Sequence, residues 1–441
     1  MINLGCPKNR VDGERILADY ARRGWIVGLP EEADLLIVNT CAFIEPATQE
    51  SWAAIEEAVE KCPGGRRRQV VVTGCLVQRD RLGLAEAFPE VRSFQDLREV
   101  ARLEARQAPR LVTTFPYAYL KIAEGCSRNC SFCLIPSLRG PFRSLPREYL
   151  LEEARGLRQA GIQEIVLVAQ DAILWGIDLY GSPRYLDLVA EIADLGFPWV
   201  RLLYLFPQLV DRDFLRRLRE IPAVVPYLDI PVQHIDDRIL GLMKRPGGEA
   251  EVRRVLDVAR TEWPEAALRT SLIAGFPSET EREFQRLYDF VAECRFDRLA
   301  LFPFYAEEGA EAAHLPGQLP SEEVERRYDA LWKLQERIYS EQNQHLVGSQ
   351  MRVLVDHLDP EEPGTLLCRS TRDAPEIDAW VRVQAQDDAA PGCDGPRVQT
   401  NAALERGGPR TQTNAEPGAY LTVRIIRGLV YDVVGELLKE A

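Results

Sequence analysis

Three cysteines, Cys126, Cys130 and Cys133, stand close together in the run EGCSRNCSFC, and we call them the central triad. Thiolates at this spacing can hold a 4Fe-4S cluster, and because four ligands normally close such a cluster, three leave one iron open to a small molecule. The alternative is a structural zinc site, which usually takes a fourth Cys or His at short range. No histidine is near, since the chain has only His234, His314, His345 and His357. The spacing therefore favours an iron–sulfur cluster that takes part in chemistry.

Three further cysteines, Cys6, Cys41 and Cys75, each come just after a predicted strand, and we call them the N-terminal triad. In this part of the chain, strand patterns alternate with helix patterns, which predicts a parallel sheet. The predicted strands are 2–4, 35–39 and 70–73, and the predicted helices are 13–22 and 49–59. Ligands bind outside the carboxyl ends of the strands in such sheets, so we expect the three thiols to converge there. Ordinary packing of buried cysteines is the alternative.

A second series of strand and helix patterns begins at Tyr117 and continues to about Leu346. The predicted strands are 117–122, 164–169, 199–205, 225–230, 268–274 and 299–304, and the predicted helices include 147–159, 249–261, 281–293 and 320–345. Six repeats predict a partial (βα)6 barrel of the TIM type, since the closed form has eight. The central triad follows the first of these strands. It therefore belongs to the C-terminal face, where barrel active sites lie.

The last part of the chain predicts a small all-β barrel of the TRAM type, with strands over 351–356, 380–384, 420–427 and 431–435. The stretch 386–418 is rich in Gly, Pro, Asn and Thr and predicts a disordered insertion. The predicted fold class is thus α/β, with a parallel-sheet domain at 1–112, a partial barrel at 113–347 and a β-barrel domain at 348–441.

Composition limits the class of protein. The chain has 441 residues, 46% hydrophobic and 28% charged, which is typical of a soluble multidomain protein, and no apolar run approaches a membrane span. The first residues do not resemble a signal peptide, so we expect the protein to be located in the cytoplasm. In that reducing compartment, ten cysteines indicate metal-binding or catalytic thiols rather than a disulfide scaffold. From Ser349 onward there are 10 Lys and Arg against 15 Asp and Glu, a net charge of −5, which favours a basic protein partner over a nucleic acid.

Over essentially its whole length the chain resembles the radical methylthiotransferases. The segments that carry this resemblance are LGCPKNRVDGE, VNTCAFI, TGCL, YLKIAEGCSRNCSFCLIPSLRG and SLIAGFPSETE. Within the family, GCPKN, LDIPVQHI and RSTRDAPEIDAWV look like the branch that modifies an aspartate of the small-subunit ribosomal protein numbered twelve. The other branch modifies an adenosine in transfer RNA, and its third domain would be expected to carry more positive charge.

The resemblance implies two 4Fe-4S clusters, one on the central triad and one on the N-terminal triad. The first would bind S-adenosylmethionine at its open iron and, given an electron, cleave it to a 5'-deoxyadenosyl radical. The second would carry the sulfur that is inserted at the β-carbon of the substrate aspartate. One molecule of S-adenosylmethionine would donate the methyl group and another the radical. An electron donor such as flavodoxin or ferredoxin is implied as a partner.

The resemblance also implies cofactor contacts from residues near the ends of the predicted barrel strands. Phe132 would pack against the adenine, for which plain core packing is the alternative. Gln170 and Asp171 would stand where the wider superfamily grips the amino group of S-adenosylmethionine, and a surface turn is the alternative. Gly275 would allow close approach of the adenine to the backbone, although Ser278 replaces a glycine usual in that segment.

Five further residues are weaker candidates. Asp229, Gln233 and His234 follow the fourth predicted strand and would contact ribose or substrate, whereas a lone histidine is as often structural. Lys244 and Arg245 would neutralise a carboxylate, unless they are an exposed basic pair. Four cysteines match no ligand position and are interpreted as structural or incidental: Cys62, Cys294, Cys368 and Cys393.

Two functions of other classes remain beside the methylthiotransferase. A zinc-stabilised binding module would bind colourless metal at each triad and would not respond to S-adenosylmethionine. An iron–sulfur redox sensor would use the same clusters without needing an open iron.

Overall fold

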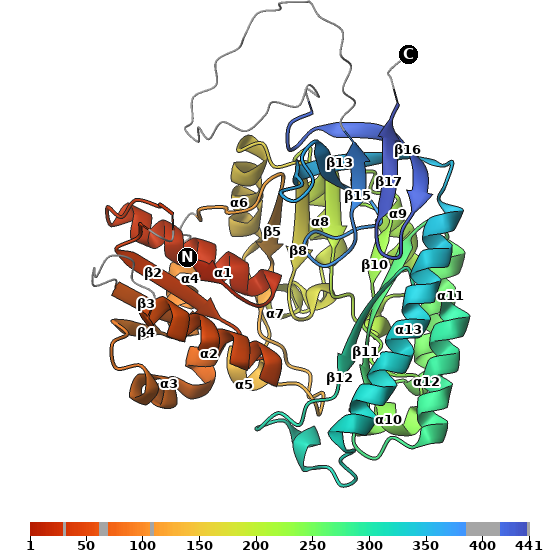
Figure 1. Cartoon of the computed structure of the whole chain (residues 1–441), viewed down its shortest axis with the longest axis horizontal. Helices are drawn as coiled ribbons and strands as arrows, with labels where there is room; N and C mark the ends of the chain where they lie inside the picture. The colour runs from red at the N-terminus through yellow and green to blue at the C-terminus, as the bar shows by residue number, and fades with distance from the viewer. Residues whose placement is uncertain (30–31, 61–68, 106–109, 385–414, 439–441) are drawn as a thin grey trace, which may run out of the picture. The chain divides into compact units, whose positions relative to one another are not determined.

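The computed structural model describes residues 1–29, 32–60, 69–105, 110–384 and 415–438 (Figure 1). They form two compact units, Met1–Ile338 and Tyr339–Ala441, which are described separately. Cys62, Cys393 and most of the predicted insertion at 386–418 lie outside the described residues. Within these described ranges, no helix has the length and apolar character needed to cross a membrane.

The first unit begins with a parallel sheet in the order β1-β2-β3-β4. Its strands are β1 (Ile2–Asn3), β2 (Leu35–Thr40), β3 (Gln69–Gly74) and β4 (Ser93–Gln95), and its helices are α1 (Pro7–Arg22), α2 (Glu45–Glu60), α3 (Cys75–Ala87) and α4 (Leu97–Ala105). Side chains alternate between the two faces of the sheet. Val38 and Val72 pack with α2 and α3, whereas Ile37 and Val71 pack with α1 and α4. Because both faces are covered, the strands read as continuous apolar runs.

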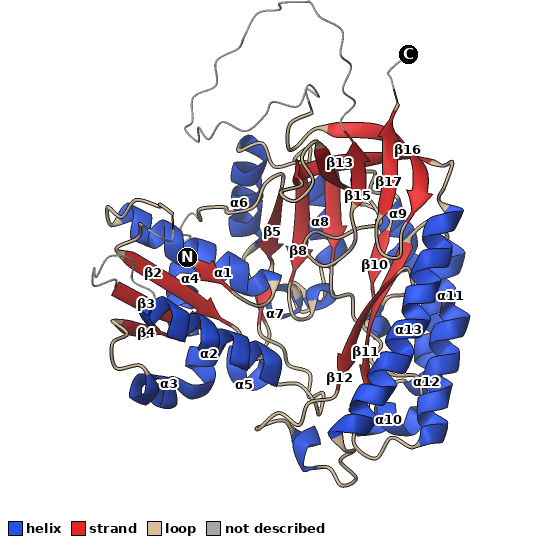
Figure 2. Cartoon of the chain, in the orientation of Figure 1, coloured by secondary structure: helices blue, strands red, loops and turns tan. Residues whose placement is uncertain are grey.

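The larger part of this unit is a partial barrel of parallel strands with helices on its outside (Figure 2). Two sheets contribute, β5-β8-β9 and β10-β11-β12. The strands are β5 (Tyr117–Lys121), β8 (Glu164–Val168), β9 (Trp199–Leu202), β10 (Tyr227–Asp229), β11 (Ala267–Ala274) and β12 (Arg298–Pro303). Backbone hydrogen bonds from Val225 to Val200 and from Leu205 to Asp229 join the two sheets, at 3.0 and 2.8 Å. The prediction of a partial (βα)6 barrel is confirmed.

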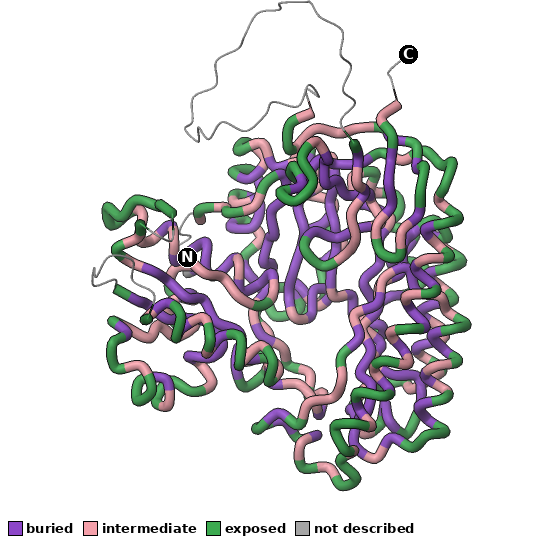
Figure 3. The backbone as a smooth tube through the Cα atoms, viewed as in Figure 1, coloured by how far each residue is buried: buried purple, intermediate pink, exposed green. Residues whose placement is uncertain are grey.

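The outer helices of the barrel are α6 (Arg147–Gln159), α8 (Tyr185–Ala193), α9 (Arg212–Arg219), α11 (Gly248–Glu262), α12 (Glu281–Cys294) and α13 (Ser321–His345). Short elements complete it: β6 (Ala123–Glu124), α5 (Ile135–Arg139), β7 (Arg143–Ser144), α7 (Ile177–Tyr180), α10 (Asp237–Leu242) and the 3-10 turns Ala172–Leu174, Pro207–Leu209 and Glu311–His314. Helix α12 begins with a capping box between Thr280 and Glu283, which satisfies free backbone amides. Buried apolar side chains of the barrel strands and of the outer helices pack together in a hydrophobic core (Figure 3).

The second unit contains a closed barrel in the order β13-β14-β15-β17-β16. Its strands are β13 (Gln350–Leu358), β14 (Thr365–Ser370), β15 (Val381–Gln384), β16 (Tyr420–Gly428) and β17 (Val433–Leu437). The predicted all-β domain is confirmed, but the sequence prediction contained no strand at β14. Every residue of β14 is buried, so its sequence TLLCRS lacks the alternation of apolar and polar residues that marks a half-exposed strand.

A buried ion pair crosses the β13–β14 pairing of this barrel. The Arg369 guanidinium donates to both carboxylate oxygens of Asp356, at 2.5 and 2.9 Å, and both residues are buried. This two-point geometry is the strongest form of the arginine–carboxylate interaction. The pair therefore ties the two strands together through a buried side-chain contact.

We expect Arg369→Met to destabilise the barrel by about 3–5 kcal/mol, because it leaves the Asp356 carboxylate buried without its guanidinium. Hydrogen–deuterium exchange of the β13 and β14 amides in the full chain measures the loss. The matched control is Arg427→Met, which removes an exposed arginine from β16 of the same barrel. Equal amide protection in the two variants would contradict the prediction.

Candidate functional site

The N-terminal triad lies at the carboxyl ends of three neighbouring parallel strands. Cys6 follows β1 and precedes α1, Cys41 follows β2, and Cys75 follows β3 as the first residue of α3. A Cβ atom built on Gly5 would lie 2.9 Å from Cys41 Sγ, so the β1 turn and the β2 turn are in contact. The structure thus brings these three cysteines to one edge of the sheet, as the strand pattern predicted.

The central triad lies in a tight loop between β6 and α5. The Cys133 amide donates to the Cys130 carbonyl at 3.1 Å, which closes a turn. The backbone amides of Arg128 and Ile135 are each 3.5 Å from a sulfur, that of Cys126 and that of Cys133 respectively. Hydrogen bonds to sulfur of this kind stabilise thiolate ligands and set the potential of an iron–sulfur cluster.

Two glycines place cysteines of the two triads. Gly74 precedes Cys75 with φ +98°, and a Cβ there would lie 2.3 Å from the Thr40 carbonyl oxygen. Gly125 precedes Cys126 with φ +75°, and a Cβ there would lie 2.3 Å from the Pro141 carbonyl oxygen. Only glycine adopts this conformation without strain and leaves room for the neighbouring backbone. The Gly-Cys pairs in the sequence therefore have a steric cause.

The cysteine sulfurs of the described residues lie too far apart to share a single zinc ion without movement. No three cysteine sulfurs in the described part of the chain lie within 4.8 Å of one another. Tetrahedral zinc with Zn–S bonds of about 2.3 Å requires sulfurs about 3.8 Å apart. Burial raises the pKa of Cys41 and of Cys133 to about 12, so each free thiol keeps its proton at neutral pH. Metal binding must displace these protons, because thiolates are the ligands.

Three carboxylates, the buried Asp12 and Glu104 and the partly buried Glu124, also lie close enough together to hold an ion. Cations of the protein already fill this space. Lys121 Nζ contacts Asp12 and lies 2.6 Å from Glu104 and 2.7 Å from Glu124. Burial opposes ionisation of Glu124, but Lys121 and Arg139 outweigh it and lower its pKa. The group is therefore a buried ion-pair cluster rather than a metal site.

Arg139, the last residue of α5, joins the two triads. Its guanidinium donates to Asp12 at 2.6 Å, to Glu124 at 3.2 Å and to the Cys75 sulfur at 3.4 Å. The carbonyl of the next residue, Gly140, accepts the Cys126 amide at 3.1 Å. One short helix end therefore contacts a cysteine of each triad, which fixes the two sites in one rigid neighbourhood.

The end of β8 carries two buried acceptor atoms that have no hydrogen-bond partner among the described residues. Gln170 donates to Glu124 at 3.2 Å, but within this part of the chain its own carbonyl oxygen accepts no hydrogen bond. Asp171 pairs with Arg128 through one oxygen, and its other oxygen has no partner in the described ranges. Burial raises the pKa of Asp171, although Arg128 acts against this rise. Unpaired buried acceptors are costly, so they indicate a ligand that donates hydrogen bonds, such as an ammonium group.

The other predicted cofactor contacts have varied surroundings. Phe132 is half-buried against an apolar group that includes Phe276. A Cβ on Gly275 would lie 2.8 Å from Val324, so α13 occupies that side of its backbone. Gln233 has φ +76° and bridges β10 to β11 through its backbone. The contacts of these residues with a cofactor stay predictions.

Asp229 and His234 are fully buried. Asp229 accepts from the Tyr204 amide at 3.0 Å and from Arg269 at 2.8 Å, so both of its oxygens hold neighbouring strands together. His234 Nδ1 accepts from the Asp236 amide at 3.0 Å. The structural alternative named for His234 therefore agrees with its burial. Cofactor contact by Asp229 stays a prediction.

Lys244 and Arg245 differ in exposure. Lys244 is partly exposed and pairs with Glu311 at the surface. The Arg245 guanidinium donates to the Pro231 carbonyl, lies 4.0 Å from the Cys130 sulfur and packs 4.2 Å from the centre of the Phe206 ring. Arg245 is therefore not part of an exposed basic pair.

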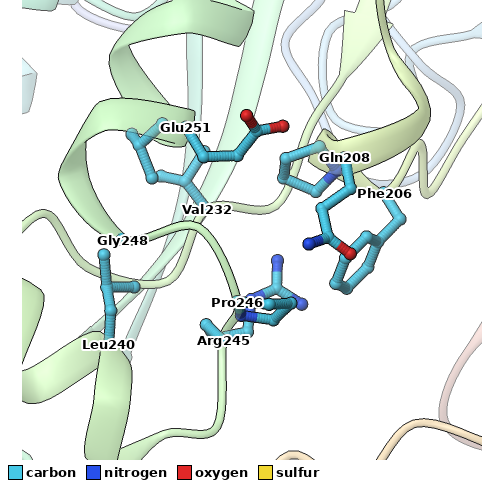
Figure 4. A pocket seen from close by; sticks show the side chains of 10 residues that line it. Phe206, Gln208, Val232, Leu240, Arg245, Pro246, Gly248 and Glu251 are labelled. Carbon is cyan, nitrogen blue, oxygen red and sulfur yellow. The ribbon is translucent and has the colours of Figure 1, made fainter.

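A small pocket opens beside Arg245. Figure 4 shows its side chain next to Phe206 and Gln208. Phe206 also packs against Arg128 of the central loop, 3.2 Å from the ring centre. The pocket therefore adjoins the central triad through these arginines.

Three family models match the chain. They are the radical SAM superfamily over residues 120–291, the uncharacterized protein family UPF0004 over 1–96 and the TRAM domain over 347–438. The ribosomal protein uS12 methylthiotransferase RimO of Geobacter sulfurreducens is 40% identical over 99% of this chain and 98% of its own. RimO of Chlorobaculum tepidum is 42% identical over 88% of this chain and 92% of its own.

This chain belongs to the RimO family of ribosomal protein uS12 methylthiotransferases. It is a radical S-adenosylmethionine enzyme, and the superfamily implies a 4Fe-4S cluster and S-adenosylmethionine as cofactors. Among solved structures, the radical S-adenosylmethionine methyltransferase TsrM from Kitasatospora setae aligns with a TM-score of 0.45 and 12% identity over 77% of this chain and 69% of that chain.

Sequence reasoning on this RimO-family chain missed four residues that the structure places around the triads: Lys8, Arg139, Tyr204 and Phe206. Lys8 and Arg139 stood inside the family segments LGCPKNRVDGE and CLIPSLRG, so their position near cysteines was a usable signal. Tyr204 and Phe206 had none, because they are two aromatic residues in an otherwise apolar strand end.

Burial of His234 has a consequence for acid stability, which we expect to see in the RimO-family fold. Burial lowers the pKa of His234 to about 3, from the ordinary 6.5. Below pH 6.5 the unfolded chain binds a proton that the folded chain does not, so stability falls as the pH drops from 6.5 toward 3 by up to about 1.4 kcal/mol per unit. His234→Asn keeps an acceptor but cannot titrate, so its urea-unfolding free energy should depend less steeply on pH.

The matched control is His314→Asn, since His314 is exposed. Its slope of unfolding free energy against pH between pH 6.5 and 5 should equal that of the wild type. A slope in His234→Asn that equals both would show that His234 does not set the acid dependence.

Proposed function

We propose that this protein adds a methylthio group to the β-carbon of an aspartate in ribosomal protein uS12, using S-adenosylmethionine and two 4Fe-4S clusters. The single observation that carries the proposal is the position of Arg139, which contacts Cys75 of the N-terminal triad and, through Gly140, Cys126 of the central triad. Two cysteine sites held by one helix end suit a reaction in which a radical formed at one site must meet sulfur held at the other.

The residues of the chain have separate tasks in this proposal. The central triad would hold the cluster that cleaves S-adenosylmethionine, and the N-terminal triad a second cluster that supplies sulfur. The unpaired oxygens of Gln170 and Asp171 would accept the ammonium of S-adenosylmethionine. Phe132, Gln233 and Gly275 would line the adenosine, and Asp229 would support them from the wall. Domains at 1–112, 113–347 and 348–441 would supply the sulfur site, the radical site and the partner surface.

The charge of the chain supports a basic protein as partner. The net charge is −14, and the segment from Ser349 onward has a net charge of −5. Such a surface attracts a basic ribosomal protein and repels the phosphates of transfer RNA. We propose the cytoplasm as the location, and a small electron carrier such as flavodoxin or ferredoxin as the reductant of the cluster.

We expect Gly74→Ala and Gly125→Ala each to lower the iron content of the anaerobically reconstituted protein to about half, because each moves one cysteine ligand and spares the other cluster. Iron and sulfide assays measure this. Only Gly125→Ala should also abolish cleavage of S-adenosylmethionine. The control is Gly156→Ala, since Gly156 lies in a helix with open space beside it. Full iron in Gly74→Ala would argue against the second cluster.

The main test uses mass spectrometry. The reconstituted enzyme, a reductant and S-adenosylmethionine are incubated with uS12 and, separately, with transfer RNA. The expected result is a methylthio mass gain on one aspartate of uS12. A gain on the RNA would keep the chemistry and overturn the substrate. Cleavage of S-adenosylmethionine with no product on either would contradict both substrates.

A further inference from the structure

Lys8 is a buried cation whose ammonium meets no carboxylate. It lies in the first turn of α1, two residues after Cys6, and is 6% exposed. Within the described residues, its Nζ forms no ion pair with a carboxylate and lies over the face of the Tyr204 ring, 3.6 Å from the centre. An aromatic face stabilises a cation only partly, and a buried charge ordinarily has an anionic partner. Lys8 is therefore placed to receive one from outside the chain.

Tyr204, on which Lys8 rests, is held in a strained conformation. Its φ is +63°, in the left-handed region that a bulky residue rarely adopts. Asp229 accepts the Tyr204 amide at 3.0 Å and is itself fixed by Arg269, which holds the turn in place. Strain of this kind persists only where surrounding structure enforces it, and it is concentrated at binding sites.

The segment that carries Tyr204 passes between the two cysteine triads. Tyr204 contacts Lys8, beside Cys6, and two residues later Phe206 packs against Arg128, which lies between two cysteines of the central triad. The contact of Lys8 with Tyr204 therefore links the neighbourhood of the N-terminal triad, where sulfur would be held, to that of the central triad, where the radical would form.

The other cations around this interval already have partners. Arg128 is paired with Asp171, and Arg139 with Asp12 and Glu124. Arg245 donates to a backbone carbonyl and lies against Cys130. Lys8 and Arg245 are thus the two cations here that pair with no carboxylate among the described side chains, and of the two it is Lys8 that lies beside the N-terminal triad.

We propose that Lys8 binds the side-chain carboxylate of the substrate aspartate and so selects an acidic side chain over a nucleobase. The inference rests on the proposed function and deepens it. In aspartate, the β-carbon is bonded directly to the carboxylate carbon, so an ammonium that holds the carboxylate also fixes the carbon that must lose a hydrogen. The Tyr204 ring and the bound carboxylate then share the charge of Lys8 from two sides.

The test is a thermodynamic cycle on reconstituted holoenzyme. Dissociation constants are measured for uS12 and for uS12 with its modified aspartate replaced by asparagine, with wild type, Lys8→Met and Lys8→Arg. We expect Lys8→Met to weaken binding of uS12 by about tenfold or more and to bind the asparagine protein as the wild type does. Lys8→Arg keeps the charge and should keep most of the affinity. The control Lys333→Met, which removes an exposed lysine, should match the wild type.

The aspartate-to-asparagine change in uS12 tests the same contact with wild-type enzyme, so it does not depend on whether Lys8→Met folds. Wild type should bind the asparagine protein about tenfold more weakly than uS12. Equal affinity of wild type for both proteins would overturn the role of Lys8. The role would also be overturned if Lys8→Met lost the same affinity for both proteins, or if it lost half of its iron. A raised KM of Lys8→Met for S-adenosylmethionine, with unchanged affinity for uS12, would overturn it as well. A wild type that neither binds nor modifies uS12 would instead overturn the proposed function.

Discussion

The buried charges around Arg139 are the constraint on which the site depends. Removing an ion from water costs several kcal/mol unless partners compensate it, and here Asp12 from α1 meets Lys121 from β5 and Arg139 from α5. Separating the N-terminal sheet from the barrel would break these ion pairs. The network therefore holds two structural layers together, and with them the two cysteine triads, at the cost of a polar junction that apolar packing alone would not require.

Local patterns predicted much of the fold. The strand ends that carry Cys6, Cys41 and Cys75, and all the barrel strands, follow from alternation of strand and helix signals, because a parallel sheet must return each strand in the same direction. The β14 strand was missed since its two faces are both buried. In the sequence, Gly74 and Gly125 are recognisable only as glycines that precede a cysteine. The need for glycine at these positions comes from the backbone of Thr40 and Pro141, which lies against them only in the folded chain.

The sequence could not predict contacts that depend on packing between distant segments. Lys8 and Tyr204 are in contact but far apart in the sequence, with most of the N-terminal sheet and half of the barrel strands between them. No sequence periodicity links the two residues. The partnerless oxygens of Gln170 and Asp171 have the same character, because a side chain is unpaired only in relation to everything packed around it. The sequence motifs therefore identified the residues that take part in the chemistry. Which other side chains surround a bound ligand depends on the packing of distant segments in the folded chain.

Charge acts at two ranges in this protein, with opposite signs. The acidic exterior acts through water, where salt screens charges beyond about 8 Å, so it affects how often a basic partner arrives more than how tightly one residue is held. The interior acts at contact distance and low dielectric, where one ammonium discriminates strongly between a carboxylate and a neutral group. An acidic protein that holds a buried cation beside its N-terminal cysteine triad can thus attract a basic polypeptide and still select an acidic side chain from it.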